Sequence, residues 1–165
     1  MASRAVPPKH MKAGEDYLSA LRSLGLVPRY AGWGWETTSK QWLLVLVTSI
    51  VDSGGPLALN RLLFRAYNAH ATPREISPFI VRVFSPDIIP DDFWILGNKN
   101  LTVSAVSGKS DWKPVNIHNM QKTFLGIEFE MINSYESPPV KRKFGYIDRR
   151  QAWERFRKSV ERLAA

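Results

Sequence analysis

The chain contains no cysteine and only three histidines. Without cysteine it can form no disulfide and no thiolate site, so a zinc ion could be held only by histidines and carboxylates. No two histidines have the spacing of metal ligands on one helix, and none accompanies a Gly-x-Ser-x-Gly motif. We therefore expect no cofactor and no bound metal.

A long apolar segment is also lacking. The longest apolar run, Trp42–Val51, is much shorter than the roughly 20 residues that a helix needs to cross a bilayer. Residues 1–10 lack the apolar stretch of a secretory signal peptide. These absences favour a soluble, cytoplasmic protein that does not act at a membrane.

Positive charge is concentrated at the two ends of the chain, whose formal net charge is +8. Residues 1–12 carry three basic and no acidic side chains, and residues 141–165 carry nine basic and three acidic ones. Such asymmetry raises the chance of an acidic partner, either nucleic acid or protein. We interpret residues 1–12 as a flexible basic arm, with Pro7 and Pro8 preventing a helix, and residues 13–165 as a single α+β domain.

The apolar run Trp42–Val51 predicts the central strand of the fold. An unbroken run of this length is typical of a strand buried on both faces, whereas a half-exposed strand alternates. A glycine-rich turn ends the run, and Pro56 suits the first turn of a helix over residues 57–70. A second apolar strand at residues 79–84 completes a βαβ unit, in which the two strands are parallel.

The remaining elements are predicted to be mostly antiparallel strands between two terminal helices. Alternating large and small residues at 30–35 indicate a hairpin partner for the central strand. Amphipathic helices are predicted near both ends, and further strands are predicted at residues 101–106, 112–118, 124–132 and 141–147. The expected fold class is a single-domain α+β fold with a mixed, mostly antiparallel sheet and one βαβ unit.

Asp52 is the first candidate for a functional site. A carboxylate at the carboxyl end of a parallel strand, beside a helix N-terminus, is where open α/β sheets place ligands. Asp52 could hold a metal or act as a base, while the amides of Gly54 and Gly55 bind an anion. The alternative is structural, with Asp52 capping the helix and the glycines forming a tight turn. The stretch matches neither a P-loop nor a dinucleotide-binding fingerprint.

Glu128 and Glu130 form a second candidate because carboxylates at i and i+2 project from the same face of a strand. They could share a divalent cation or provide acid–base chemistry, and together with Asp52 they would form a metal-dependent hydrolase. A nuclease of the restriction-enzyme type would have a lysine here, which this chain lacks, so a solvated polar face is the alternative. His118 is a weak candidate for a general base.

The basic C-terminal segment gives the largest functional signal. All nine of its Lys and Arg side chains could contact phosphates, and we take six as the candidate nucleic-acid-binding residues: Lys141, Arg142, Lys143, Arg149, Arg150 and Arg157. Trp33 and Trp35 could add base stacking, but the favoured role of these aromatics is to pack the sheet against a helix. The alternative is an ordinary solvated helix, because Glu154 and Glu161 lie four positions from basic residues.

Three functions follow from these patterns. The first is a small interaction or accessory protein that binds an acidic partner, and it is favoured because no catalytic set assembles. The second is a nucleic-acid-binding protein that uses the C-terminal basic face. The third is a metal-dependent hydrolase that uses Asp52, Glu128 and Glu130.

Overall fold

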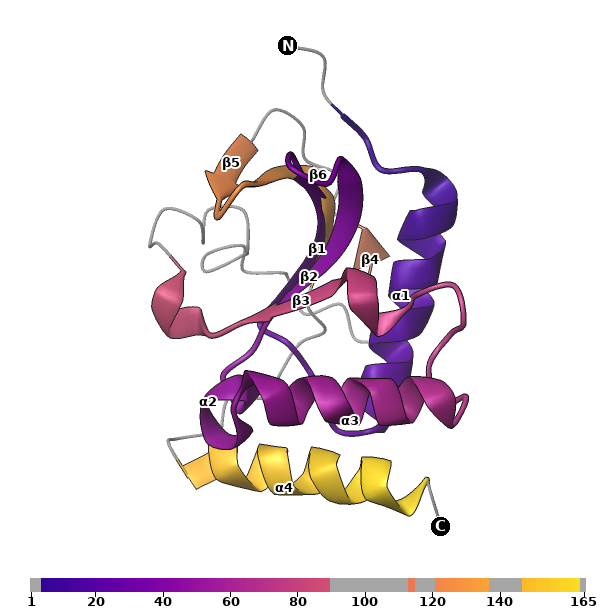
Figure 1. Cartoon of the computed structure of the whole chain (residues 1–165), viewed down its shortest axis with the longest axis vertical. Helices are drawn as coiled ribbons and strands as arrows, with labels where there is room; N and C mark the ends of the chain where they lie inside the picture. Colours follow the sequence, from indigo (N-terminus) through magenta and orange to yellow (C-terminus); the bar gives the residue numbers. More distant parts are fainter. Residues whose placement is uncertain (1–3, 90–112, 115–120, 137–146, 164–165) are drawn as a thin grey trace, which may run out of the picture.

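The structure of the chain is a computed structural model (Figure 1). It describes residues 4–89, 113–114, 121–136 and 147–163. The predicted strand at 101–106, most of those at 112–118 and 141–147, and the candidates His118, Lys141, Arg142 and Lys143 lie outside the described residues.

A mixed six-stranded sheet forms the centre of the molecule, in the order β3-β2-β1-β6-β4, with β5 also paired to β6. The strands are β1 (Tyr30–Glu36), β2 (Gln41–Val47), β3 (Val81–Phe84), β4 (Lys113–Pro114), β5 (Gln121–Phe124) and β6 (Ile127–Glu136). Among these strands β2 and β3 are parallel, and the other pairs are antiparallel. The predicted α+β class, the hairpin of the central strand and the βαβ unit are thereby confirmed.

Within the described residues, four α-helices accompany the sheet: α1 (Pro8–Ser23), α2 (Ile50–Gly54), α3 (Pro56–Asn68) and α4 (Ile147–Arg162). Short 3₁₀ turns precede and follow β3 at Pro78–Ile80 and Pro86–Ile88. Figure 1 shows α1 beside the sheet and α3 between the sheet and α4, which forms the outermost layer. In the described part of the chain, no helix combines the length and apolar character that a membrane crossing requires.

β2 is buried on both faces, as its unbroken apolar pattern predicts. Leu44 and Leu46 belong to the larger core, which the sheet shares with α1, α3 and α4. Leu43, Val45 and Val47 belong to a smaller core on the opposite face, shared with β6. The alternation of these side chains between two cores explains why the sequence shows no polar face in this strand.

A buried hydrogen-bonded pair connects β1, β6 and α1. The indole N–H of Trp33 donates to the hydroxyl of Tyr135 at 2.8 Å, and that hydroxyl donates to the carbonyl of Met11 at 2.8 Å. Burial raises the pKa of Tyr135, so the hydroxyl stays protonated and can donate. A side chain at Gly14 would overlap the Tyr135 ring, so glycine permits this close approach of α1. Trp33 is fully buried, as the favoured packing role predicts, and is therefore not available for base stacking.

The first helix begins earlier in the chain than its sequence predicts. We expected Pro7 and Pro8 to prevent a helix, but Pro8 is the first residue of α1, where a proline loses no hydrogen bond. The preceding segment lies against the sheet, because Val6 is buried and its N–H donates to the side chain of Asn133 at 3.0 Å. The predicted basic arm therefore overlaps α1 over residues 8–12.

The central strand ends at Val47 rather than at Val51. The Thr48 hydroxyl accepts a hydrogen bond from the Ile50 N–H at 3.3 Å, and α2 begins there. Ile50 and Val51 are still buried, but they reach the core from a helix. Because both structures bury these residues, the apolar run alone did not distinguish them.

The predicted strand at residues 124–132 is in fact the end of one strand and the start of the next. Leu125 and Gly126 have φ angles of 49° and 75° and form the two-residue turn between β5 and β6. Leu125 is 67% exposed instead of lying on the buried face, as its place in the alternation predicted. Beyond the turn, the alternation holds, since Ile127 and Phe129 are buried.

We expect Tyr135→Phe to lower the free energy of unfolding by about 1–3 kcal/mol, because the buried indole of Trp33 loses its acceptor. Urea denaturation measures this loss. The matched control is Tyr67→Phe on the half-buried face of α3, which should change stability by less than about 0.5 kcal/mol. Equal urea midpoints for Tyr135→Phe and the wild type would contradict the role of this hydrogen bond.

Candidate functional site

The structure brings Asp52 together with the first turns of α4. A polar pocket of about 500 Å³ lies between α2 and α4 and is lined by Asp52, Ser53, Arg149, Arg150, Trp153 and Glu154. Asp52 and the pair Arg149 and Arg150 were predicted as two separate candidate sites. The structure places them in the lining of the same pocket. The residues are far apart in the sequence, so only the packing of α4 on α2 reveals their proximity.

Asp52 has a different local setting from the one that its sequence predicts. It lies within α2 instead of at the end of a strand, and the side chain does not cap α3, whose N-cap is Gly55. Its carboxylate accepts a hydrogen bond from the Ser85 hydroxyl at 2.9 Å, and this hydroxyl accepts one from the Asp87 N–H at 3.2 Å. Asp52 thus links α2 to the segment that follows β3.

Gly54 and Gly55 serve the packing of the helices. A side chain at Gly54 would overlap the indole ring of Trp153, which lies directly against this residue. Gly55 has a φ of 83°, which a residue with a side chain rarely adopts, and its N–H donates to the Val51 carbonyl at 2.8 Å. This geometry favours a structural role over the predicted anion binding at the two glycines.

Glu128 and Glu130 lie far from Asp52 along the sheet. Glu128 pairs with Trp35 near the turn between β1 and β2, whereas Asp52 follows the opposite end of β2. Both glutamates contact Arg4: its backbone N–H donates to Glu130 at 2.9 Å, and its guanidinium lies 3.9 Å from Glu128. The same guanidinium lies 4.2 Å from the centre of the Trp35 ring. These carboxylates therefore hold the N-terminal segment against the sheet.

The hydrolase hypothesis gains no support from this arrangement. Asp52 and the two glutamates do not converge, and no group of three or more His, Asp or Glu side chains suited to a metal ion occurs in the described part of the chain.

The charged side chains of α4 are paired unevenly. Arg157 contacts both Glu154, at 2.5 Å, and Glu161, at 3.0 Å. The hydrogen bond from Arg157 lowers the pKa of Glu154 and raises the pKa of Arg157. The ion pairs expected from Arg150 and Lys158 to Glu154 do not form, although both cations lie near enough to lower its pKa further. Arg157, predicted as a nucleic-acid contact, is thus already engaged.

The remaining cations of α4 differ in their exposure to solvent. Arg149 is half-buried. Within the part of the chain that the structure describes, four exposed side chains of α4 form no ion pair: Arg150, Arg155, Lys158 and Arg162. Three of these are not among the six candidates, but their spacing of i, i+3 and i+7 identifies them as one helix face.

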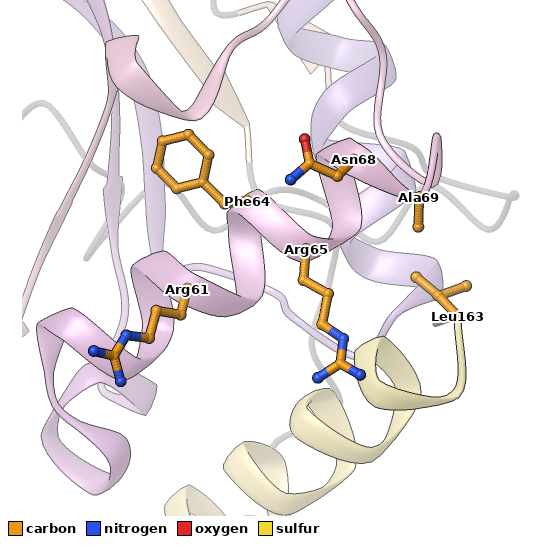
Figure 2. A pocket seen from close by; sticks show the side chains of 6 residues that line it. All are labelled: Arg61, Phe64, Arg65, Asn68, Ala69 and Leu163. Atoms are coloured by element: carbon orange, nitrogen blue, oxygen red, sulfur yellow. The ribbon is translucent and has the colours of Figure 1, made fainter. Parts of the chain in front are cut away.

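A second hollow lies between α3 and the C-terminal end of α4. It has a volume of about 650 Å³ and is lined by Arg61, Phe64, Arg65, Asn68, Ala69 and Leu163. Figure 2 shows Arg65 extending from α3 toward α4 and Leu163 lying near Ala69. Leu163 continues the helical spacing of Trp153, Phe156 and Val160 but is 38% exposed, whereas those three side chains are buried.

Comparison of the chain with models of known protein families, with curated protein sequences and with solved structures gives no match.

We expect Gly54→Ala to destabilise the protein by about 1–3 kcal/mol, because the new methyl group displaces the Trp153 ring and with it the start of α4. Ser53→Ala, at the exposed neighbouring position, is the control and should change stability by less than about 0.5 kcal/mol. Urea denaturation followed by circular dichroism compares the two. A more stable Gly54→Ala variant, as ordinary helix propensity predicts, would contradict the close packing.

Proposed function

We propose that this protein is a non-catalytic interaction protein that binds an acidic partner through the outward face of α4. The observation that carries the proposal is the pairing of Arg157 with both Glu154 and Glu161, which uses both glutamates of the helix on a single cation. Arg155, Lys158 and Arg162 consequently form a positive face that α4 itself does not neutralise.

The position of α4 supports this function. Trp153, Phe156 and Val160 fix the opposite side of the helix in the core, so the outward cations are presented on a rigid element. Cations grouped in this way repel one another, and an acidic partner relieves the repulsion and releases the counterions around its own charges. Arg61 and Arg65 on the adjacent α3 extend the positive surface.

The polar pocket beside α4 supports binding better than catalysis. Its lining contains two carboxylates, Asp52 and Glu154, but the first accepts a hydrogen bond from Ser85 and the second from Arg157. No histidine is among the described residues that line the pocket. General-base catalysis requires an available base positioned near a reacting group, and neither carboxylate has that setting.

The test compares two double variants that remove the same charge from different surfaces. Arg155→Gln with Lys158→Gln alters the outward face of α4, and Lys9→Gln with Lys40→Gln alters exposed positions on α1 and in the β1–β2 turn. Fluorescence anisotropy with labelled duplex DNA, single-stranded RNA and polyglutamate at roughly 50 and 200 mM salt measures binding. We expect the α4 variant to bind at least about tenfold more weakly at the lower salt and, for duplex DNA, its log–log salt slope to be smaller by roughly two.

The control variant should retain most of the wild-type affinity because its lysines lie away from α4. Equal weakening of both variants would show that net charge, and not the α4 face, determines binding, and would contradict the proposal. Absence of binding to all three probes at the lower salt would also contradict it.

A further inference from the structure

The outward side of α3 carries a stripe in which apolar and polar side chains alternate, and which the described residues leave largely exposed. Leu57, Arg61, Phe64 and Asn68 are spaced i, i+4, i+7 and i+11, which places them on one side of the helix. The opposite side supplies Leu59, Leu62, Leu63 and Ala66 to the core. Leu57 is nevertheless 63% exposed. α3 therefore carries apolar side chains on its outward side as well, although an amphipathic helix needs only one apolar side to pack on the core.

Other exposed apolar side chains gather around this stripe. Phe79, in the turn before β3, is 74% exposed and packs edge-on against Phe64, with ring centres 4.9 Å apart. Leu163 borders the same hollow from α4. Of the five large apolar side chains that are exposed in the described residues, three belong to this region: Leu57, Phe79 and Leu163. Grouping of exposed apolar side chains on one surface is a common feature of sites that contact another molecule.

Positive charge borders the apolar surface. Arg61 and Arg65 are exposed and form no ion pair with any residue that the structure describes. In Figure 2 Arg65 extends from α3 toward α4, and Arg61 lies nearer the start of α3. Both side chains line the hollow, together with Phe64 and Leu163. The surface therefore combines apolar contacts with cations that need a negative counterpart, and aromatic and arginine side chains are enriched at the centres of protein interfaces.

We propose that this surface, formed by Leu57, Arg61, Phe64, Arg65 and Leu163, docks an acidic segment of a partner protein that carries apolar side chains beside its carboxylates. The inference rests on the proposed binding of an acidic partner and specifies its class. A nucleic acid offers phosphates to the arginines but no aliphatic side chains to the leucines. A second copy of the chain would bring the same cations together, at a net charge of +8 for each copy.

The experiment uses two labelled peptides of equal negative charge. One is amphipathic, with leucines at helical spacing between glutamates, and the other has the leucines replaced by serines. We expect the wild-type protein to bind the leucine-containing peptide at least about tenfold more tightly. Leu57→Gln with Leu163→Gln should abolish that preference, and Arg61→Gln with Arg65→Gln should weaken both peptides. Anisotropy titrations on the full chain provide the affinities.

The matched control replaces exposed apolar side chains elsewhere. Ile88→Gln with Leu125→Gln removes two side chains that are 53% and 67% exposed and lie outside this surface. It should leave the preference for the leucine-containing peptide unchanged. Circular dichroism on each variant verifies that the helices remain folded.

The outcomes separate this inference from the proposed function. If both peptides bind equally, and only the α4 variant Arg155→Gln with Lys158→Gln weakens them, the docking surface is refuted while acidic binding by α4 stands. If duplex DNA binds and neither peptide does, the partner is a nucleic acid and the inference is overturned. If wild-type protein self-associates in sedimentation and the Leu57 and Leu163 substitutions prevent this, a second copy covers the surface instead.

Discussion

The position of α4 depends on the contact between the Trp153 indole and the backbone at Gly54. This contact places the first turns of α4 directly on α2, and Phe156 and Val160 continue the same buried stripe toward α3. With this side of the helix fixed in the core, the basic side chains have no position except on the outside or in the pocket beside Asp52. The packing of Trp153 thereby helps to determine on which side of α4 its basic side chains lie.

Charge pairing within α4 determines which of those cations can bind a partner. Opposite charges four positions apart are common on solvated helices, and such spacing predicts one partner for each cation. Here Arg157 takes both glutamates, so Arg150, Arg155, Lys158 and Arg162 form no ion pair within the described part of the chain. Exposed ion pairs contribute little to stability, which means that this distribution costs the fold little. It leaves a surface that an acidic molecule can neutralise.

Much of the fold could be predicted from the sequence, because the spacing of apolar residues reflects which side of each helix or strand is buried. The buried stripes of α1, α3 and α4, the hairpin of β1 with β2 and the parallel pairing of β2 with β3 all follow from apolar spacing. Errors occurred where burial does not determine conformation. Ile50 and Val51 are buried in a helix as well as they would be in a strand, and Leu125 turns the chain although it continues an alternating pattern.

The candidate site could be predicted only in part. The basic C-terminal segment and Asp52 were evident as single features, but their shared pocket depends on contacts between residues distant in sequence. The double pairing of Arg157 could not be predicted, because spacing permits several pairings of Glu154 and only packed side chains select one. Leu57 and Phe64 on the outer side of α3 can be read from the sequence. That they do not belong to the core follows only from the structure, in which the opposite side of α3 is buried.

Mapping of amide chemical shifts by two-dimensional NMR, during titration of the full chain with polyglutamate, tests the central claim most directly. The account predicts that the largest shifts fall in residues 149–163, with smaller ones along residues 57–69, and that they diminish as salt is raised. Shifts concentrated in α1 and the N-terminal segment, or spread evenly over the surface, would contradict the assignment of binding to α4.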